Sequence, residues 1–258
     1  MVSTFVSYNA ITRDLERSLQ RVQTQPMVQR ESDYYLENIE KVKSVEDFMG
    51  NDRLYRYAMK AFGLEDMAYA KAFMVKVLEG GIDDSDSFAN SLNDQRYREF
   101  AETFNFVRFG EDTTIFDRTR QGTVDRYLRQ TLEENAGDQN EGVRLALYFE
   151  RKAPDIESFY SILADGALAK VVRTSLSLPD SFALLDVDKQ VEIFERSLDI
   201  EDFKDPEALS EFLSRFTSMW EIANPTSATL PNTAILFGQP AEMGISTDLL
   251  LTMQKLKF

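Results

Sequence analysis

The side chains most able to do chemistry in this sequence are its carboxylates. The stretch GGIDDSDSF (80–88) places Asp84 and Asp86 two residues apart, the spacing with which an EF-hand calcium loop begins. Phe88 stands where the next ligand belongs, and no glycine stands at the sixth position. We therefore interpret this stretch as a turn that leads into a helix, and we expect no metal site and no cofactor.

Three pairs of adjacent carboxylates could in principle transfer protons: Glu46/Asp47, Glu65/Asp66 and Glu201/Asp202. Each pair lies where a loop is predicted to enter a helix, a position that favours capping and solvated turns. The chain has no Cys and no His, which excludes thiolate catalysis, histidine bases and the Ser-His-Asp triad. No phosphate-binding glycine loop or GxSxG motif is present. We predict that the protein is not an enzyme and has no small-molecule substrate.

The composition predicts a helical protein. Among 258 residues only 11 are Gly and 7 are Pro, and the apolar residues recur at helical spacing. The net charge is −15 with no visible basic face, which argues against nucleic acid as a partner. The apolar runs AILF and LLL fall far short of the ~20 residues of a spanning helix, so we expect no membrane insertion. The N-terminus lacks the features of a cleaved signal peptide.

An internal repeat organises the sequence. LYRYAMKAFGLED (54–66) and LAKVVRTSLSLPD (168–180) share one apolar pattern, and the similarity extends over 44–106 and 155–216. Each copy holds two half-units, in which a Phe and then an Asp precede an amphipathic stripe. We interpret these four aspartates as helix N-caps: Asp52, Asp94, Asp165 and Asp205.

The predicted fold is all-α, with two duplicated multi-helix lobes, a helical connector and helical segments at both ends. The predicted parts are an N-terminal helical segment (1–43), repeat lobe 1 (44–106), a connector with helices near 122–134 and 142–152 (107–154), repeat lobe 2 (155–222), and an extended tail with a C-terminal helix (223–258). The end segments carry apolar stripes outside the repeats, and we predict that these stripes bind partners: Tyr8, Ile11, Leu15, Leu19, Val22, Ile245, Leu249, Met253 and Leu256.

Three segments carry a resemblance to a known family: SVEDFMGNDRLYRYAMKAFGLED, SLNDQRYREFAETFNF and GVRLALYFERKAPDIESFYSILAD. They resemble an uncharacterised family, a domain of unknown function found mainly in alphaproteobacteria and associated with flagellar gene clusters. The resemblance covers roughly residues 10–220. It implies a helical fold and a flagellar connection, and it assigns no residue a role.

The function that this resemblance favours is a non-enzymatic structural component of the flagellar basal body or rod. Proteins of the rod, hook and filament typically lack Cys and a cleaved signal, and they pair an N-terminal with a C-terminal helix. We therefore expect assembly through the terminal helices, with copies of itself or other flagellar proteins as partners, and export to the flagellum. The helical body and the absence of an asparagine-rich N-terminal signature differ from known rod proteins. The alternatives are a cytosolic adaptor or export chaperone that holds a partner helix in a groove, and an enzyme with a polar pocket of shifted carboxylates.

Overall fold

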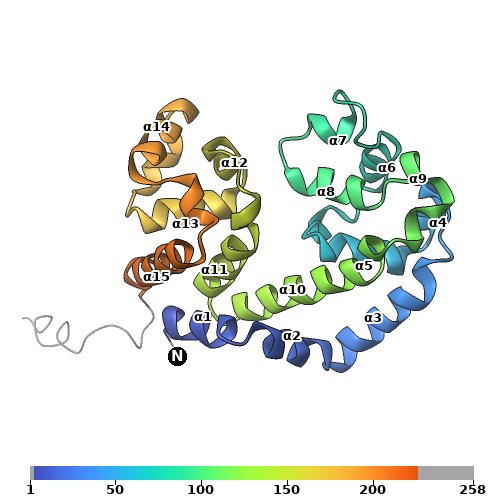
Figure 1. Ribbon diagram of the computed structural model, residues 1–258, viewed down its shortest axis with the longest axis horizontal. Helices are drawn as coiled ribbons and strands as arrows, with labels where there is room; N and C mark the ends of the chain where they lie inside the picture. The colour runs from blue at the N-terminus through green and yellow to red at the C-terminus, as the bar shows by residue number, and fades with distance from the viewer. Residues whose placement is uncertain (1–2, 226–258) are drawn as a thin grey trace, which may run out of the picture. The chain divides into compact units, whose positions relative to one another are not determined.

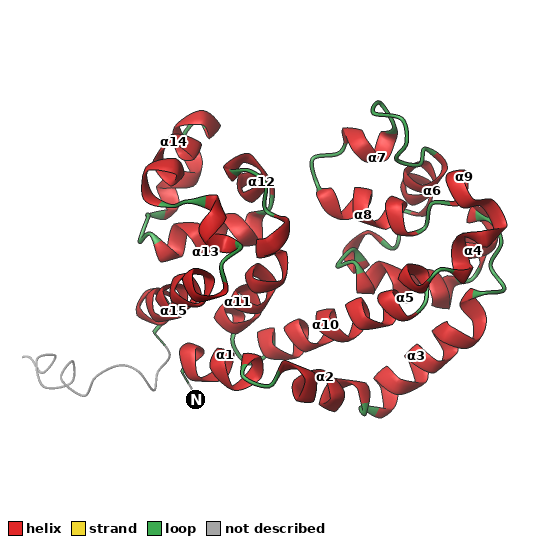
Figure 2. Cartoon of the chain, viewed as in Figure 1, coloured by secondary structure: helices red, strands yellow, loops and turns green. Residues whose placement is uncertain are grey.

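The structure is a computed structural model that describes residues 3–225 (Figure 1). Helices joined by short loops make up the described part of the chain, and no strand occurs in it (Figure 2). The all-α prediction is therefore confirmed. Over the same residues, none of the helices combines the length and the apolar character needed to cross a membrane. The predicted C-terminal helix, with Ile245, Leu249, Met253 and Leu256, lies outside the described residues.

The N-terminal segment forms three helices rather than two. A break at Arg13 and Asp14 divides the first predicted stripe, because the Asp14 carboxylate caps the second helix by accepting from the Arg17 amide at 3.1 Å. Pro26 begins the third helix, where its missing N–H costs nothing. The helices are α1 (Thr4–Thr12), α2 (Leu15–Gln23) and α3 (Pro26–Ile39).

The first lobe begins with a Ser44 cap, whose hydroxyl accepts from the Asp47 amide at 3.1 Å. The cap of the next helix is Asn51, which accepts from the Leu54 amide at 3.2 Å. Our assignment of Asp52 as that cap is wrong by one residue. The elements are α4 (Val45–Gly50), α5 (Asp52–Ala61), η1 (Glu65–Met67), α6 (Lys71–Glu79), α7 (Phe88–Ser91), α8 (Gln95–Thr103) and α9 (Phe106–Phe109).

The connector contains the two predicted helices, and each is a little longer than expected. The Asn140 side chain caps the second of them by accepting from the Gly142 amide at 2.9 Å. The elements are η2 (Gly110–Ile115), η3 (Asp117–Thr119), α10 (Gln121–Gly137), α11 (Glu141–Lys152) and η4 (Ala153–Asp155).

The second lobe repeats the capping pattern of the first. Asp165 accepts from the amides of Ala167 and Leu168, and Asp205 accepts from those of Glu207 and Ala208. With Asp94, which accepts from the Arg96 amide, three of the four predicted aspartate caps are confirmed. The elements are α12 (Phe159–Ala164), α13 (Gly166–Ser175), η5 (Asp180–Leu184), α14 (Val187–Ser197), η6 (Ile200–Phe203) and α15 (Pro206–Ala223).

From α4 to α8 and from α12 to α15 the two lobes have a similar order of elements, with η6 in the second lobe where α7 stands in the first. Helix α9 has no counterpart among the described residues of the second lobe. In the first lobe the order is α4, α5, η1, α6, α7 and α8, and in the second α12, α13, η5, α14, η6 and α15. This order fits the predicted duplication, but the superposition of the lobes stays a prediction.

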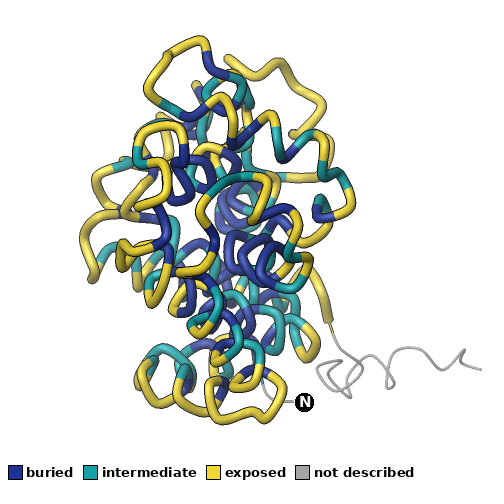
Figure 3. The backbone as a smooth tube through the Cα atoms, turned by 90° about the vertical axis from the view of Figure 1, so that its right-hand side faces the viewer, coloured by how far each residue is buried: buried dark blue, intermediate teal, exposed yellow. Residues whose placement is uncertain are grey.

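The apolar stripes form two hydrophobic cores. The backbone of the buried residues runs through the inside of the body, with exposed segments around it (Figure 3). The first core gathers side chains of α3 to α8 and most of the apolar side chains of α10, such as Tyr127 and Leu132. The second core gathers side chains of α11 to α15 together with Ala136 at the end of α10. Helix α10 therefore belongs to both cores, and it positions the surfaces that the lobes present to each other.

Candidate functional site

The predicted N-terminal binding stripe lies inside the structure. Tyr8 is buried in the second core and Val22 in the first, while Ile11 packs against both. Leu15 and Leu19 are half-buried against the first core. Helix α1 packs on α11 and α2 packs on α10 (Figure 1). The stripe thus has an intrachain explanation, and binding of a partner through these five residues stays a prediction.

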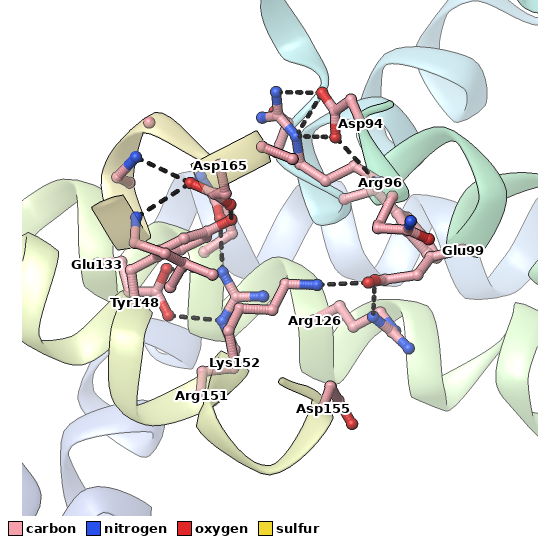
Figure 4. Close-up of a pocket in the computed structure, with 18 of the residues that line it drawn as sticks. Asp94, Arg96, Glu99, Arg126, Glu133, Tyr148, Arg151, Lys152, Asp155 and Asp165 are labelled. Atoms are coloured by element: carbon pink, nitrogen blue, oxygen red, sulfur yellow. Dashed lines mark hydrogen bonds and ion pairs between the residues drawn. The ribbon is translucent and has the colours of Figure 1, made fainter. Parts of the chain in front are cut away.

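A cavity of about 480 Å³ lies between the lobes (Figure 4). One side is formed by the end of α5, by η1 and by the start of α8, and the other by α11, α12 and the start of α13. Helix α10 contributes the residues between them. Its lining is rich in charged side chains of both signs, with eight acidic and five basic: Glu65, Asp66, Asp94, Glu99, Glu133, Glu134, Asp155, Asp165, Arg96, Arg126, Arg144, Arg151 and Lys152.

Glu133 of α10 is the most deeply buried of these charges, with 2% of its side chain exposed. Its carboxylate accepts from Arg129 Nε at 3.1 Å, and from Arg151 Nε and Nη2 at 2.7 and 2.8 Å. Arg129 also donates to the Leu147 carbonyl at 2.9 Å and pairs with Glu150 at 3.3 Å. Two guanidinium groups therefore surround one carboxylate and join α10 to α11.

Glu99 of α8 pairs across the cavity with two cations (Figure 4). Its Oε1 accepts from Lys152 of α11, and its Oε2 lies 3.4 Å from Nη1 of Arg126 on α10. The first lobe is thereby held to the connector by charges that are partly shielded from water.

Asp94 and Arg96 form a second charged unit at the start of α8. The hydrogen bond from Arg96 to the Asp94 carboxylate raises the pKa of Arg96. Burial acts to raise the pKa of Asp94, but the side-chain and backbone hydrogen bonds of Arg96 outweigh it and leave that pKa below its usual value. Arg96 also donates to the Gly63 carbonyl, which fixes the turn between α5 and η1.

Tyr148 and Asp165 connect α11 to α13. The Tyr148 hydroxyl donates to Asp165 Oδ2 at 2.6 Å, while Asp165 Oδ1 caps α13. Burial and then the neighbouring Asp165 carboxylate raise the pKa of Tyr148, so its hydroxyl stays protonated. The cap predicted from sequence thus also serves as an acceptor inside the cavity.

The contacts of the charged and hydroxyl side chains determine which chemistry the cavity can support. Three of its five cations are paired with carboxylates of neighbouring helices. Of its two hydroxyl side chains, Tyr148 donates to the Asp165 carboxylate and Ser161 donates to the Ser158 carbonyl. Within residues 3–225, no cluster of three or more Asp or Glu is arranged to hold a metal ion. The ion pairs in the cavity attach α8, α10 and α11 to one another electrostatically.

Sequence reasoning missed this cavity almost entirely. Arg129 and Glu133 are four residues apart on α10, a spacing that signals an ion pair but not its burial. Arg151 and Lys152 lie in the last turn of α11, where cations interact favourably with the negative end of the helix dipole, so the sequence gives no reason to expect them in a cavity. The long-range pairs that bury them leave no local pattern in the sequence.

The fold and the cavity define an all-α protein of two helical lobes and a connector, whose helices α10 and α11 are joined by buried ion pairs. Residues 61–209 match the family DUF1217, described as "Protein of unknown function (DUF1217)", and the chain belongs to this family. It is similar to the crystal structure of protein AGR_C_984 from Agrobacterium tumefaciens, at 51% identity and a TM-score of 0.81. That similarity covers 87% of this chain and 98% of the other. No curated protein matches the chain.

The comparisons support an uncharacterised family with a relative in an alphaproteobacterium. This confirms the coarser part of the resemblance found in the sequence.

Proposed function

We propose that the protein is a non-enzymatic structural component of the bacterial flagellum, associated with the basal body or rod, which assembles with other flagellar proteins or with its own copies. The main support for a non-enzymatic role is that the charged side chains in the cavity are paired with one another. Glu133 and Glu99 each hold two cations, and these pairs join α8, α10 and α11. Charged groups that are paired in this way favour a structural role in a rigid body over a role in catalysis.

The flagellar part of the proposal draws on the resemblance to a family associated with flagellar gene clusters. The complete lack of Cys agrees with it, since proteins of the rod, hook and filament typically lack Cys. We further propose export without a cleaved signal peptide. The segment 245–258, with its predicted apolar stripe, is the proposed assembly element.

Mass spectrometry of purified hook–basal bodies tests this proposal. The protein should be recovered in them from wild-type cells, and a chain lacking residues 245–258 should be absent from them while keeping the body folded. Cells with the truncated chain should swim poorly. A truncated chain that assembles and supports normal swimming would remove the main argument for a structural component.

The second candidate function is a cytosolic helical adaptor or export chaperone for flagellar proteins. The burial of Tyr8 and Val22 favours it, because rod proteins use an N-terminal helix for assembly and here that helix is packed into the body. An adaptor should fractionate with the cytosol and be missing from basal bodies of cells that swim normally.

A further inference from the structure

An exposed apolar patch lies on the second lobe, where α12 meets the start of α14. Its exposed fractions are 53% for Tyr160, 88% for Leu184, 42% for Leu185 and 51% for Val187. The Tyr160 hydroxyl donates to Asp188 Oδ1 at 2.9 Å, which brings α12 and α14 together at this point. We call these four apolar residues the α14 patch. Large apolar side chains grouped on a surface mark an interaction site.

The first lobe shows what is missing at this patch. There α6, which has the place of α14 in the order of elements, packs against α4, α7, α8 and α9. Helix α9 follows α8 directly and buries Phe106 in the first core. In the second lobe α15 instead continues to Ala223, and its Trp220 lies against Gly142 at the start of α11. Among the described residues, α12 is the helix that packs extensively on α14.

The charge around the patch indicates what would cover it. Residues 180–195 contain five acidic side chains and one basic one. Segment 245–258 has the opposite balance, with Lys255 and Lys257 against Asp248, and its sequence predicts an apolar helical stripe from Ile245 to Leu256. Opposite charges around matching apolar surfaces favour one register of docking.

We propose that the α14 patch binds segment 245–258 of a second copy of this chain. A helix of about ten residues is marginal alone in water, so this segment requires an apolar surface. The N-terminal stripe does not offer one, because its side chains are packed into the two cores. The contact joins different surfaces of the two copies, so it either closes a dimer by reciprocal exchange of the segments or continues into a larger ring or a filament. This inference rests on the proposed function for the role of 245–258 in assembly.

Disulfide trapping tests the contact in full-length chains, since the chain has no Cys of its own. One chain carries Val187→Cys and the other Leu249→Cys. Mixed under mild oxidation, they should give a linked dimer on a non-reducing gel at least about tenfold faster than a control mixture, because docking raises the effective concentration of the thiols. In the control, Ser85→Cys in the exposed loop of the first lobe replaces Val187→Cys. Equal rates in the two mixtures would overturn the proposal.

Other occupants of the patch give other products. The double variant Val187→Cys/Leu249→Cys would form a monomer with an internal disulfide if the segment of the same chain covered the patch. Val187→Cys alone would form a dimer if the patches of two copies met. Either product, in place of the mixed dimer, contradicts docking of the segment of a second copy.

A charge placed in the patch provides a second readout. Leu184→Asp, added to the Val187→Cys chain, should slow formation of the mixed crosslink by at least about tenfold. It places a charge where the docked segment would otherwise cover an apolar leucine. Leu184 is exposed in the described chain, so far-UV circular dichroism should stay unchanged. An unaffected crosslink would mean that the patch is not the docking surface. These measurements use purified protein, so their failure leaves the basal-body result untouched, and the reverse also holds.

Discussion

Replacement of Glu133 by Ala should be among the most destabilising single changes in the protein. Its carboxylate holds Arg129 and Arg151 through three hydrogen bonds of 2.7 to 3.1 Å and is almost fully shielded from water. Removal of one partner from a buried ion pair leaves an uncompensated charge and costs about 3–5 kcal/mol. Here two guanidinium groups lose their carboxylate, and only Arg129 keeps a second one, on Glu150.

Urea unfolding followed by two probes measures this loss. Far-UV circular dichroism reports all helices, and the fluorescence of Trp220, the one tryptophan of the chain, reports the second core. The matched control is Glu192→Ala, which breaks an exposed pair with Arg196 and should cost about 0.2–1 kcal/mol. The double variant Glu133→Leu/Arg151→Met should recover much of the lost stability, because it removes one buried carboxylate together with one guanidinium group and leaves Arg129 paired with Glu150.

The comparison between these variants decides whether the reasoning holds. A loss for Glu133→Ala no larger than that for Glu192→Ala would mean that the charges around Glu133 are solvated. A double variant less stable than Glu133→Ala would mean that the ion pair itself, and not the avoidance of unpaired charge, stabilises the contact between α10 and α11.

Three further predictions concern caps, packing and pH. Asn51→Ala should lower the free energy of unfolding by about 1 kcal/mol, and Asp52→Ala by less, because Asn51 accepts the Leu54 amide; equal losses in urea melts would contradict this assignment. Gly142→Ala should cost about 1–3 kcal/mol and change Trp220 fluorescence, since a Cβ there would lie 2.3 Å from Trp220 Cδ1; Gly166→Ala, with no atom within 4 Å, is the control that should be neutral. Burial raises the pKa of Glu150, so its contribution to stability is largest below the ordinary glutamate pKa and falls as the pH rises through the raised value. Glu150→Gln should therefore gain stability relative to wild type between pH 4 and pH 7, and a constant difference over that range would refute the shift.

The sequence predicted the helical class and the two connector helices because these follow from local periodicity and composition. Three aspartate caps were found for the same reason, since a cap depends on the next three residues. Asp52 was misassigned because Asn51 beside it caps equally well, and an apolar pattern does not fix a helix start to one residue.

The sequence could not predict the cavity, nor could it predict that the N-terminal stripe packs inside the protein's own body. An apolar stripe shows that a helix has a buried face, but it does not show what covers that face. Tyr8 and Val22 are covered by α10, α11 and their own cores rather than by another protein. Glu133 depends on Arg151, 18 positions away and on another helix, and such pairs have no local signal.

The path of α1 and α2 across both cores also sets an order of events during synthesis. Thr4 accepts a hydrogen bond from Asn140, 136 positions later in the chain, and Tyr8 completes a core built from α11 to α15. When the ribosome has made α2 to α10, the first core can close, but only one end of α1, at Ile11, packs against it. The main partner of α1 is α11, and the core around Tyr8 is complete only after the second lobe has emerged. Contacts this distant in sequence form slowly, and domains generally fold in the order of their synthesis. Helix α1 is therefore made before the other described helices but docks only after α11 has emerged, and until then its apolar face is open to chaperones and to other nascent chains.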